Sequence, residues 1–287
     1  MMNASTTALE ATLDFPCCDT QWRIRARDGS LGGRQVLQRA RERVTQLAAV
    51  LDAFDQRSAI ARLNREGTVE DEHVAALVTR GKEYHERTRG AFSIANGTWE
   101  QAIKRFIRGA TDEAPSPATS ARYRVRGAIV TTSAPLDLNG LAKGYIVDRA
   151  QAVLDGAGVD GFVDGGGDIA RPTGPVAIDT PSAPGRTLGV LDTRWNVATS
   201  GNSKRRRGRV DHIYDPREGR VGARHEQVTV VAKRDCLEAD ALATTLCVMS
   251  LDEGLRLVAG WSGVEALWVT DGRLFASEGF GDHVWKA

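Results

Sequence analysis

The hydrophobic pattern of this chain changes once, near residue 111, and that change limits the folds open to it. Before it, apolar residues recur at helical spacing over residues 35–54, 58–64, 70–89 and 99–107. Residues 111–122 are rich in Pro, Ser, Thr and Ala and read as a surface loop. Short strand-like runs follow, interrupted by a helix from Leu141 and another over residues 237–249. This order predicts an α+β fold, with helices first and a sheet-rich half after them.

The length of 287 residues suits one large domain or two intimate lobes. We predict a single domain over residues 31–287, with a helical part over 31–110 and a sheet-rich part over 121–287. Residues 1–30 are expected to form an N-terminal extension or a first strand. No internal repeat is evident in the sequence.

Composition argues against several classes of function. A hydrophobic fraction of 41% and a charged fraction of 26% are typical of a soluble globular protein. A net charge of +1 gives no overall electrostatic attraction to nucleic acids or membranes. No run is long enough for a membrane span or a signal peptide, so we expect a cytoplasmic protein without a nucleic-acid partner. The four cysteines lack metal-site spacing and are expected to be buried or inert: Cys17, Cys18, Cys236 and Cys247.

The segment LDLNGLAKGYIVDRA, residues 136–150, reads as strand, tight turn and helix. Residues 136–139 alternate apolar and polar, Asn139-Gly140 is a turn signal, and helical spacing begins at Leu141. Lys143 is therefore predicted in the first turn of a helix, whose N-terminus favours anions such as phosphate. The alternative is an ordinary junction that carries an exposed lysine.

Two glycine-containing loops are candidate ligand contacts. Three successive glycines in GFVDGGGDIA, residues 161–170, allow a ligand to approach the backbone, although a glycine-rich hairpin explains them equally well. This pattern is not a Rossmann fingerprint. Residues 199–202 form a polar turn, and His212 and Asp215 follow soon after it. His212 is either a structural histidine or a general base.

A helix and a short capped segment supply the remaining candidates. Asp240 and Thr244 are four residues apart and face one side of their helix, which makes a partial oxygen site for a hard ion such as Mg²⁺. The alternative is a buried hydrogen bond between the two side chains. Ser58 and Asn64 flank apolar residues in a segment that a capped short helix also explains.

Six segments occur in one order: FDQRSAIARLN, RTRGAFSIANGTW, LDLNGLAKGYIVDRA, VDGGGDI, TSGN with HIYDPREG, and ADALATTLCVM. Together they resemble the ApbE family of flavin transferases, from about residue 31 to the C-terminus. The resemblance implies an ApbE-like, T-fold-related architecture of mixed and antiparallel sheets with packed helices. It also implies a reaction in which FMN moves from FAD to a threonine or serine of an acceptor protein, and AMP leaves.

The resemblance also implies roles for individual residues. It assigns flavin-nucleotide binding to nine positions: Ser58, Asn64, Lys143, Gly165, Gly166, Asp168, Ser200, Gly201 and Asn202. It assigns Mg²⁺ to the backbone carbonyl of Ala142 and to the side chains of Asp240 and Thr244. His212 matches the base that activates the acceptor hydroxyl, and Lys143 is a second catalytic candidate that stabilises phosphate charge.

Two other functions use the same residues. Water in place of the protein hydroxyl would give an FAD pyrophosphatase that yields FMN and AMP. If the departures from the family pattern abolish catalysis, the protein would be a non-catalytic flavin-binding module.

The sequence departs from the family pattern at four places. Ser93 stands where an aspartate is usual, Phe54 where many members have tyrosine, and Ala59 where an acidic residue is usual. Ser203 replaces an aromatic residue, and the loop after it, residues 204–209, is unusually basic. One interpretation is that this loop binds an acidic target protein or a phosphate group. The other is that it is a solvated insert. None of these changes removes the presumed metal or base residues, so we expect an active enzyme.

Overall fold

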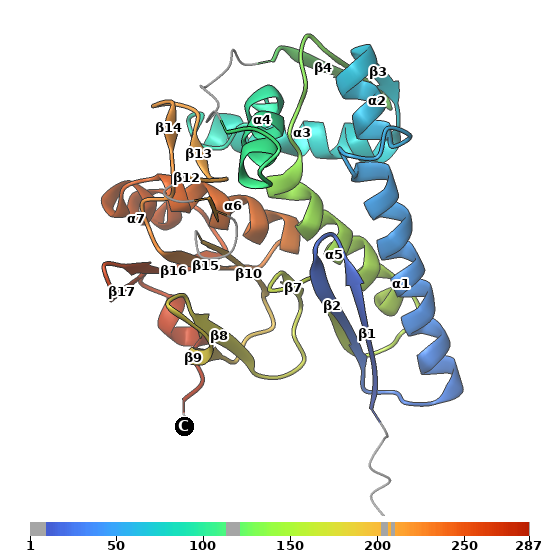
Figure 1. The fold of residues 1–287 in the computed structure, drawn as a ribbon. Helices are drawn as coiled ribbons and strands as arrows, with labels where there is room; N and C mark the ends of the chain where they lie inside the picture. Colours follow the sequence, from blue (N-terminus) through green and yellow to red (C-terminus); the bar gives the residue numbers. More distant parts are fainter. Residues whose placement is uncertain (1–9, 113–120, 202–205, 208–209, 287) are drawn as a thin grey trace, which may run out of the picture.

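The computed structural model describes residues 10–112, 121–201, 206, 207 and 210–286, and an eight-stranded sheet dominates it (Figure 1). Each neighbouring pair of strands in this sheet is antiparallel. In spatial order the strands are β1 (Ala11–Cys17), β2 (Thr20–Ala26), β6 (Gly161–Asp164), β7 (Ile169–Ala170), β10 (Asn196–Gly201), β15 (Gln227–Ala232), β16 (Val264–Thr270) and β17 (Arg273–Ala276). The predicted α+β class with antiparallel sheets and packed helices is confirmed.

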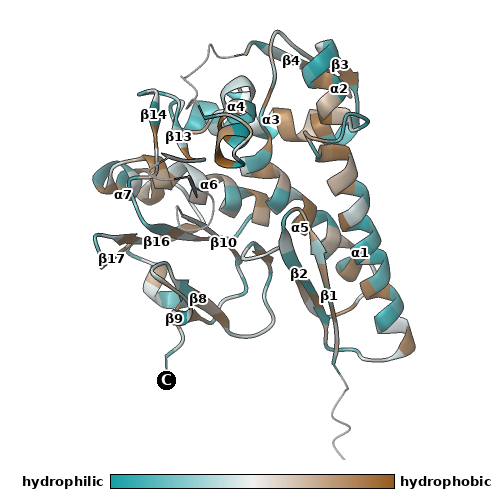
Figure 2. Ribbon diagram, viewed as in Figure 1, coloured by the Kyte–Doolittle hydropathy of each residue, from teal (hydrophilic) through white to brown (hydrophobic). Residues whose placement is uncertain are grey.

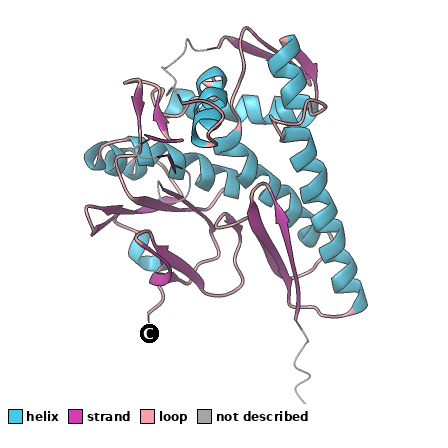
Figure 3. Ribbon diagram, viewed as in Figure 1, coloured by secondary structure: helices cyan, strands magenta, loops and turns pink. Residues whose placement is uncertain are grey.

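Helices cover one face of this sheet (Figure 3). Helix α1 (Leu31–Leu51) packs on β1, β2 and α5 (Asn139–Gly156), and α6 (Cys236–Val248) packs on β10, β15 and α5. The apolar stripe predicted for α1 is present, and Figure 2 shows hydrophobic and hydrophilic patches alternating along that helix. Helix α7 (Leu251–Ala259), which the sequence analysis did not anticipate, packs on β16.

A smaller apolar cluster covers the opposite face of the sheet. The hairpin of β8 (Val176–Thr180) and β9 (Ala183–Leu191) lies there with the short 3₁₀ helix η1 (Phe280–His283). Strand β15 shows how both faces are filled, because Val228 and Val230 join the main core while Val231 joins the smaller cluster. The successive side chains of a strand point to opposite faces, so a strand covered on both sides is buried at every position, as β15 is.

The helical part of the chain adds a second, small sheet. Helices α2 (Ala59–Glu66), α3 (Glu72–Arg87) and α4 (Gly97–Ile107) accompany the three strands β3 (Thr68–Glu70), β5 (Ile129–Thr132) and β4 (Tyr123–Arg126). Four further strands form two short hairpins: β11 (Arg206–Arg207) with β12 (Val210–Asp211), and β13 (Tyr214–Asp215) with β14 (Arg220–Val221). One continuous apolar core runs from α2 and α3 to the large sheet.

The strand predicted for residues 136–139 is wrong. This segment pairs with no described strand, because its backbone groups bond elsewhere: Leu136 N–H donates to Asn64 Oδ1 at 2.8 Å and Asp137 N–H donates to the Ile94 carbonyl at 2.8 Å. Helix α5 begins at Asn139, within the predicted turn. Lys143 therefore lies in the second turn of the helix and not in the first.

The N-terminal region contributes two strands to the large sheet. Strands β1 and β2 form a hairpin, and β2 pairs with β6, so residues 11–26 lie at one edge of the sheet beside α1. No helix of the described residues is both long and apolar enough to cross a membrane.

Candidate functional site

The close contact between α5 and α6 depends on Gly144. A Cβ atom at this position would lie 2.7 Å from the Cys236 carbonyl oxygen and 2.7 Å from Leu237 Cα. Real Cβ atoms do not come this close to backbone, so only glycine lets the two helices meet here. The contact brings the Gly144 N–H to within 3.0 Å of Asp240 Oδ2, where it donates a hydrogen bond. The helix contact thus fixes the carboxylate of Asp240 beside α5.

Lys143 makes an ion pair with an aspartate from the glycine-rich loop. Its Nζ lies 2.9 Å from Asp168 Oδ2, and Asp168 is 1% exposed whereas the lysine side chain keeps 30% of its surface exposed. Burial by itself would lower the pKa of Lys143, but the nearby carboxylates of Asp168 and Asp240 outweigh it and raise that pKa. The lysine is therefore charged at neutral pH.

Asp168 and Asp240 form a buried pair of carboxyl groups that one lysine does not neutralise. Burial raises the pKa of Asp168 well above its usual range, and the neighbouring Asp240 raises it further. Burial also raises the pKa of Asp240, although Lys143 and the hydrogen bond from the Gly144 N–H each lower it. Among the described residues, no donor has good hydrogen-bond geometry toward Asp168 Oδ2. The pair thus holds either a proton or a further cation.

The loop that carries Asp168 is held by the side chain of Asp164. Asp164 Oδ1 accepts hydrogen bonds from the N–H groups of Gly166 and Gly167, both at 2.8 Å. Gly167 has a φ of 102°, and no described atom beyond its two chain neighbours lies within 4 Å of the position its Cβ would take. The loop is therefore open to a ligand at Gly167. An aspartate two residues before a glycine is a turn signal, so Asp164 was recognisable from the sequence.

The other two glycines of this loop lie against protein side chains. A Cβ at Gly165 would meet Val147 at 2.8 Å and Trp22 at 3.0 Å. A Cβ at Gly166 would lie 2.2 Å from Thr20 Oγ1. These two predicted binding residues thus pack against α5 and the β1–β2 hairpin.

The predicted residue Thr244 lies where three elements converge. Its Oγ1 is 3.3 Å from Ser200 Oγ, at the end of β10. A Cβ at Gly140 would lie 3.8 Å from Thr244 Cγ2 and 3.1 Å from a ring carbon of Phe92. Asp240 bonds to Gly144 and Thr244 to Ser200, so the alternative of an Asp–Thr hydrogen bond is not supported. Phe92 is a neighbour that the sequence analysis did not single out.

The remaining predicted residues on α5 and β10 lie next to these groups in the chain. Ala142 is half-buried between Gly140 and Lys143, one residue before the ion pair. Gly201 is also half-buried, ends β10 and pairs with Gln227 of β15.

Two of the predicted binding residues, Ser58 and Asn64, make hydrogen bonds that stabilise the fold. Ser58 is the N-cap of α2, where its Oγ accepts the N–H of Ala61 at 3.0 Å, and it is 4% exposed. Asn64 clamps the segment before α5, because it also donates from Nδ2 to the Leu136 carbonyl at 3.0 Å. Asn64 thereby sets where α5 begins.

His212 is half-buried on the segment between β12 and β13. Asp215, which follows it, is fully buried and accepts hydrogen bonds from Arg217 through the backbone N–H at 3.0 Å, Nε at 3.1 Å and Nη2 at 3.0 Å. Burial opposes ionisation of Asp215, but these bonds hold its pKa below the usual range. Asn202, Ser203 and residues 204, 205, 208 and 209 of the basic loop lie outside the described residues.

Three of the departures from the family pattern have clear local settings. Ser93 Oγ accepts the N–H of Ala95 at 3.1 Å, and Ala59 is buried in the first turn of α2. Phe54 is 45% exposed and lies beneath Arg108, whose guanidinium carbon is 4.5 Å from the ring centre.

A metal ion at this site would need more than acidic side chains. Within the part of the chain that the structure describes, no three His, Cys, Asp or Glu side chains are grouped as a metal site. Mg²⁺ takes few protein ligands and keeps waters and substrate phosphates for the rest, so the carboxylate of Asp240, the hydroxyl of Thr244 and a backbone carbonyl suit it. The excess negative charge of Asp168 and Asp240 fits the same ion.

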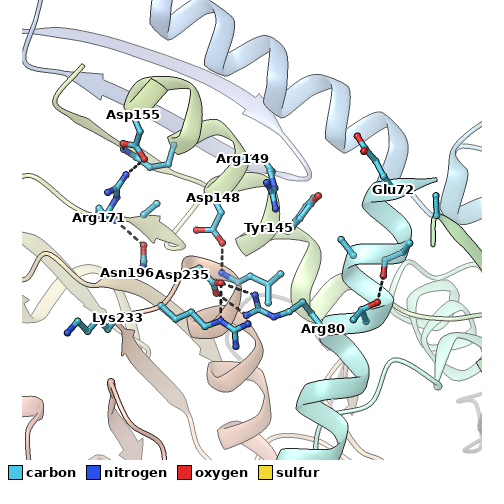
Figure 4. Close-up of a pocket in the computed structure, with 18 of the residues that line it drawn as sticks. Glu72, Arg80, Tyr145, Asp148, Arg149, Asp155, Arg171, Asn196, Lys233 and Asp235 are labelled. Carbon is cyan, nitrogen blue, oxygen red and sulfur yellow. Dashed lines mark hydrogen bonds and ion pairs between the residues drawn. The ribbon is translucent and has the colours of Figure 1, made fainter. Parts of the chain in front are cut away.

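A cavity of about 850 Å³ lies between α3, α5 and the start of α6 (Figure 4). None of the predicted site residues lines it. Its wall contains ion pairs such as Arg80 with Asp235 at 2.9 Å and Arg171 with Asp155. Asp148, also in the wall, accepts the N–H groups of Cys236 and Leu237 and so caps α6. The cavity is thus bounded by groups that hold the helices in place.

Comparison with known families gives the class of protein. The model of the ApbE family matches residues 18–268. The chain therefore belongs to the ApbE family.

Two relatives from bacteria carry the name FAD:protein FMN transferase. The protein from Treponema pallidum is 30% identical in an alignment of length 280 that covers 82% of this chain and 77% of that protein. The protein from Rhodobacter capsulatus is 32% identical in an alignment of length 235 that covers 72% of this chain but 44% of that protein.

Solved structures show the same fold at low sequence identity. An ApbE protein from Thermotoga maritima superposes with a TM-score of 0.85 at 23% identity, over 97% of this chain and 100% of its own. The flavin transferase ApbE from Vibrio cholerae gives 0.78 at 22% identity, over 96% of this chain and 99% of its own. These likenesses confirm the predicted ApbE-like architecture.

Proposed function

We propose that this protein is a Mg²⁺-dependent FAD:protein FMN transferase, which links FMN through a phosphoester bond to a threonine or serine of an acceptor protein. Membership of the ApbE family and the names of its relatives support the reaction class. The observation that carries the assignment is the buried Asp168–Asp240 pair beside Lys143. Two carboxylates carry two negative charges, and the single lysine balances only one of them. A site for Mg²⁺ and a pyrophosphate would have this charge balance.

The side chains of Asp240 and Thr244 and the backbone carbonyl of Ala142 would hold the metal ion. The Gly144 N–H donates to one oxygen of Asp240, Oδ2, and the other oxygen would be available to the ion. When bound, Mg²⁺ would offset the charge that develops on the pyrophosphate oxygens.

Lys143 and the glycine loop would bind the nucleotide. The contact with Asp168 Oδ2 can engage at most one of the three N–H donors of the lysine, so the others can reach a phosphate oxygen. Gly167 offers exposed backbone on the same loop, and Ser200 and Gly201 border the site from the end of β10. Gly165, Gly166, Ser58 and Asn64 would act by shaping this binding site, through the packing contacts and hydrogen bonds described above.

His212 would act as the general base. It takes the proton of the acceptor hydroxyl, whose oxygen then attacks the phosphorus of the FMN half of FAD. The bond from that phosphorus to the AMP oxygen breaks, and AMP leaves with the electron pair. Lys143, held charged by its carboxylate neighbours, would stabilise the negative charge on the transferring phosphate.

Product analysis tests this proposal. The purified protein is incubated with FAD and Mg²⁺, with and without a candidate acceptor protein, and AMP and FMN are separated by chromatography. AMP release that depends on the acceptor supports the transferase. Equal release of AMP and free FMN in both reactions identifies an FAD pyrophosphatase, and tight FAD binding without AMP identifies a flavin-binding module.

Substitution of Asp240 by alanine tests the metal assignment. We expect Mg²⁺-dependent AMP release to fall by a factor of about 10² or more, as is usual when a group that stabilises transition-state charge is lost. Asp252→Ala is the matched control, because Asp252 is an exposed carboxylate in the first turn of α7 and lies outside the site. Unchanged turnover in a folded Asp240→Ala protein would refute the metal assignment.

A further inference from the structure

Two adjacent cysteines occupy the tip of the β1–β2 hairpin. Cys17 pairs with Thr20, so Cys18 and Asp19 form a two-residue turn, with φ angles of 52° and 57°. This left-handed conformation is typical of a type I′ hairpin turn but is uncommon for cysteine. The Sγ atoms of Cys17 and Cys18 are 3.6 Å apart. The turn thus presents two thiols in contact with each other at the molecular surface.

The four cysteines, expected from the sequence to be buried or inert, differ in their exposure. Cys236 and Cys247 are indeed buried, but Cys17 is half-buried and Cys18 is exposed. The hydrogen bond from Cys18 lowers the pKa of Cys17 to about 7, and the same interaction raises the pKa of Cys18. Cys17 therefore exists in substantial part as the thiolate, the form that attacks disulfides.

The hairpin tip is packed against the loop that carries Asp168. The Thr20 side chain fills the space beside Gly166, and Trp22 lies against Gly165. The Trp22 indole N–H also donates to the Cys17 carbonyl oxygen at 2.9 Å. A change in the turn at Cys17 and Cys18 therefore acts directly on the residues that support the glycine loop.

We propose that Cys17 and Cys18 form a reversible vicinal disulfide by exchange with a small-molecule disulfide, and that closure of this bond loosens the loop of residues 164–168. Closure brings together two sulfur atoms that are already in contact, but it must distort the turn. Adjacent Cα atoms are about 3.8 Å apart across a trans peptide, whereas disulfides usually join Cα atoms at least about 4.4 Å apart. The bond is consequently strained and easily reduced, which is the property of a labile, regulatory disulfide.

The exchange proceeds in two steps. The Cys17 thiolate attacks one sulfur of the small disulfide, whose S–S bond breaks, and the first thiolate leaves. The Cys18 thiol then passes its proton to that thiolate and attacks Cys17 Sγ, which expels the second thiolate. Two protein thiols are oxidised, and one small disulfide is reduced to two thiols. Loss of the negative charge on Cys17 in the first step removes the main cause of the raised pKa of Cys18.

Intact-mass analysis after incubation with oxidised glutathione tests the closure. The protein is then alkylated in denaturant, where Cys236 and Cys247 serve as internal references. We expect the wild type to lose two alkylation adducts, carry no glutathione, and regain both adducts after dithiothreitol. We expect Cys18→Ser to retain one glutathione at Cys17. A stable glutathione adduct on the wild type, or full alkylation of both cysteines, would overturn the proposal.

Hydrogen–deuterium exchange tests the coupling to the loop. We expect the amides of Gly166 and Gly167, which bond to Asp164, to exchange about tenfold faster in the oxidised wild type than in the reduced protein. The Cys18→Ser protein, treated identically, should show no such change. Equal exchange in the oxidised and reduced wild type would overturn the coupling. Neither readout uses flavin chemistry, so both outcomes are independent of the proposed function.

Discussion

Replacing Gly144 by alanine tests the claim that the contact between α5 and α6 builds the site. The new Cβ would lie 2.7, 2.7 and 2.9 Å from three backbone atoms of Cys236 and Leu237. Backbone atoms do not rotate away as a side chain does, so α5 must move off α6. Such a movement also weakens the hydrogen bond from the Gly144 N–H to Asp240.

The size of the effect follows from two opposing terms. Overpacking costs roughly 1–3 kcal/mol, and contacts with backbone place this substitution near the upper end of that range. Alanine is better than glycine in a helix by about 1 kcal/mol, which offsets part of the cost. We therefore expect the free energy of unfolding to fall by about 2 kcal/mol.

Urea denaturation followed by circular dichroism measures this change. Gly156→Ala is a matched control in the same helix, because no described atom outside the neighbouring residues and backbone of α5 lies within 4 Å of the position its Cβ would take. That variant should be unchanged or more stable by up to about 1 kcal/mol. A Gly144→Ala protein as stable as Gly156→Ala would refute the reasoning.

Two further predictions concern stability. Asn64→Ala removes both hydrogen bonds to the Leu136 backbone and should lower the free energy of unfolding by about 1–3 kcal/mol. The control Gln38→Ala, at an exposed position of α1, should change the free energy of unfolding by less than about 0.5 kcal/mol. Equal urea midpoints for these two variants would contradict the clamp. His225 is buried and bonds to Thr270 and to the Met249 carbonyl, and this burial lowers its pKa. Its stabilising contribution should therefore be fully present above pH 6.5, the pKa of an unfolded histidine, and should decline as the pH falls below that value. Urea titrations between pH 5 and 8 should therefore show a steeper loss for the wild type than for His225→Gln, and parallel curves would exclude this role.

Local sequence signals predicted many of the elements. The apolar stripe of α1, the serine cap of α2 and the apolar run of α6 depend on residues close in the chain, and all three helices are present. Spacing of four residues also placed Asp240 and Thr244 on one side of α6, where both border α5.

Contacts between distant segments account for what the sequence did not reveal. Residues 136–138 alternate like a strand, but Asn64 and Ile94, far away in the chain, supply their hydrogen bonds. The ion pair of Lys143 with Asp168 depends on the position of the β6–β7 loop beside α5, which follows from the strand order of the large sheet. No spacing within the sequence encodes that order.

The mass of an acceptor protein after reaction measures the central claim most directly. A candidate acceptor is incubated with this protein, FAD and Mg²⁺, denatured to remove bound flavin, and weighed intact by mass spectrometry beside a variant that has alanine in place of the acceptor threonine or serine. We predict a covalent gain equal to FMN less one water on the intact acceptor, none on its alanine variant, and none when Asp240→Ala replaces the wild-type enzyme. An acceptor that gains no mass while FAD is converted to AMP and free FMN would contradict the transferase assignment.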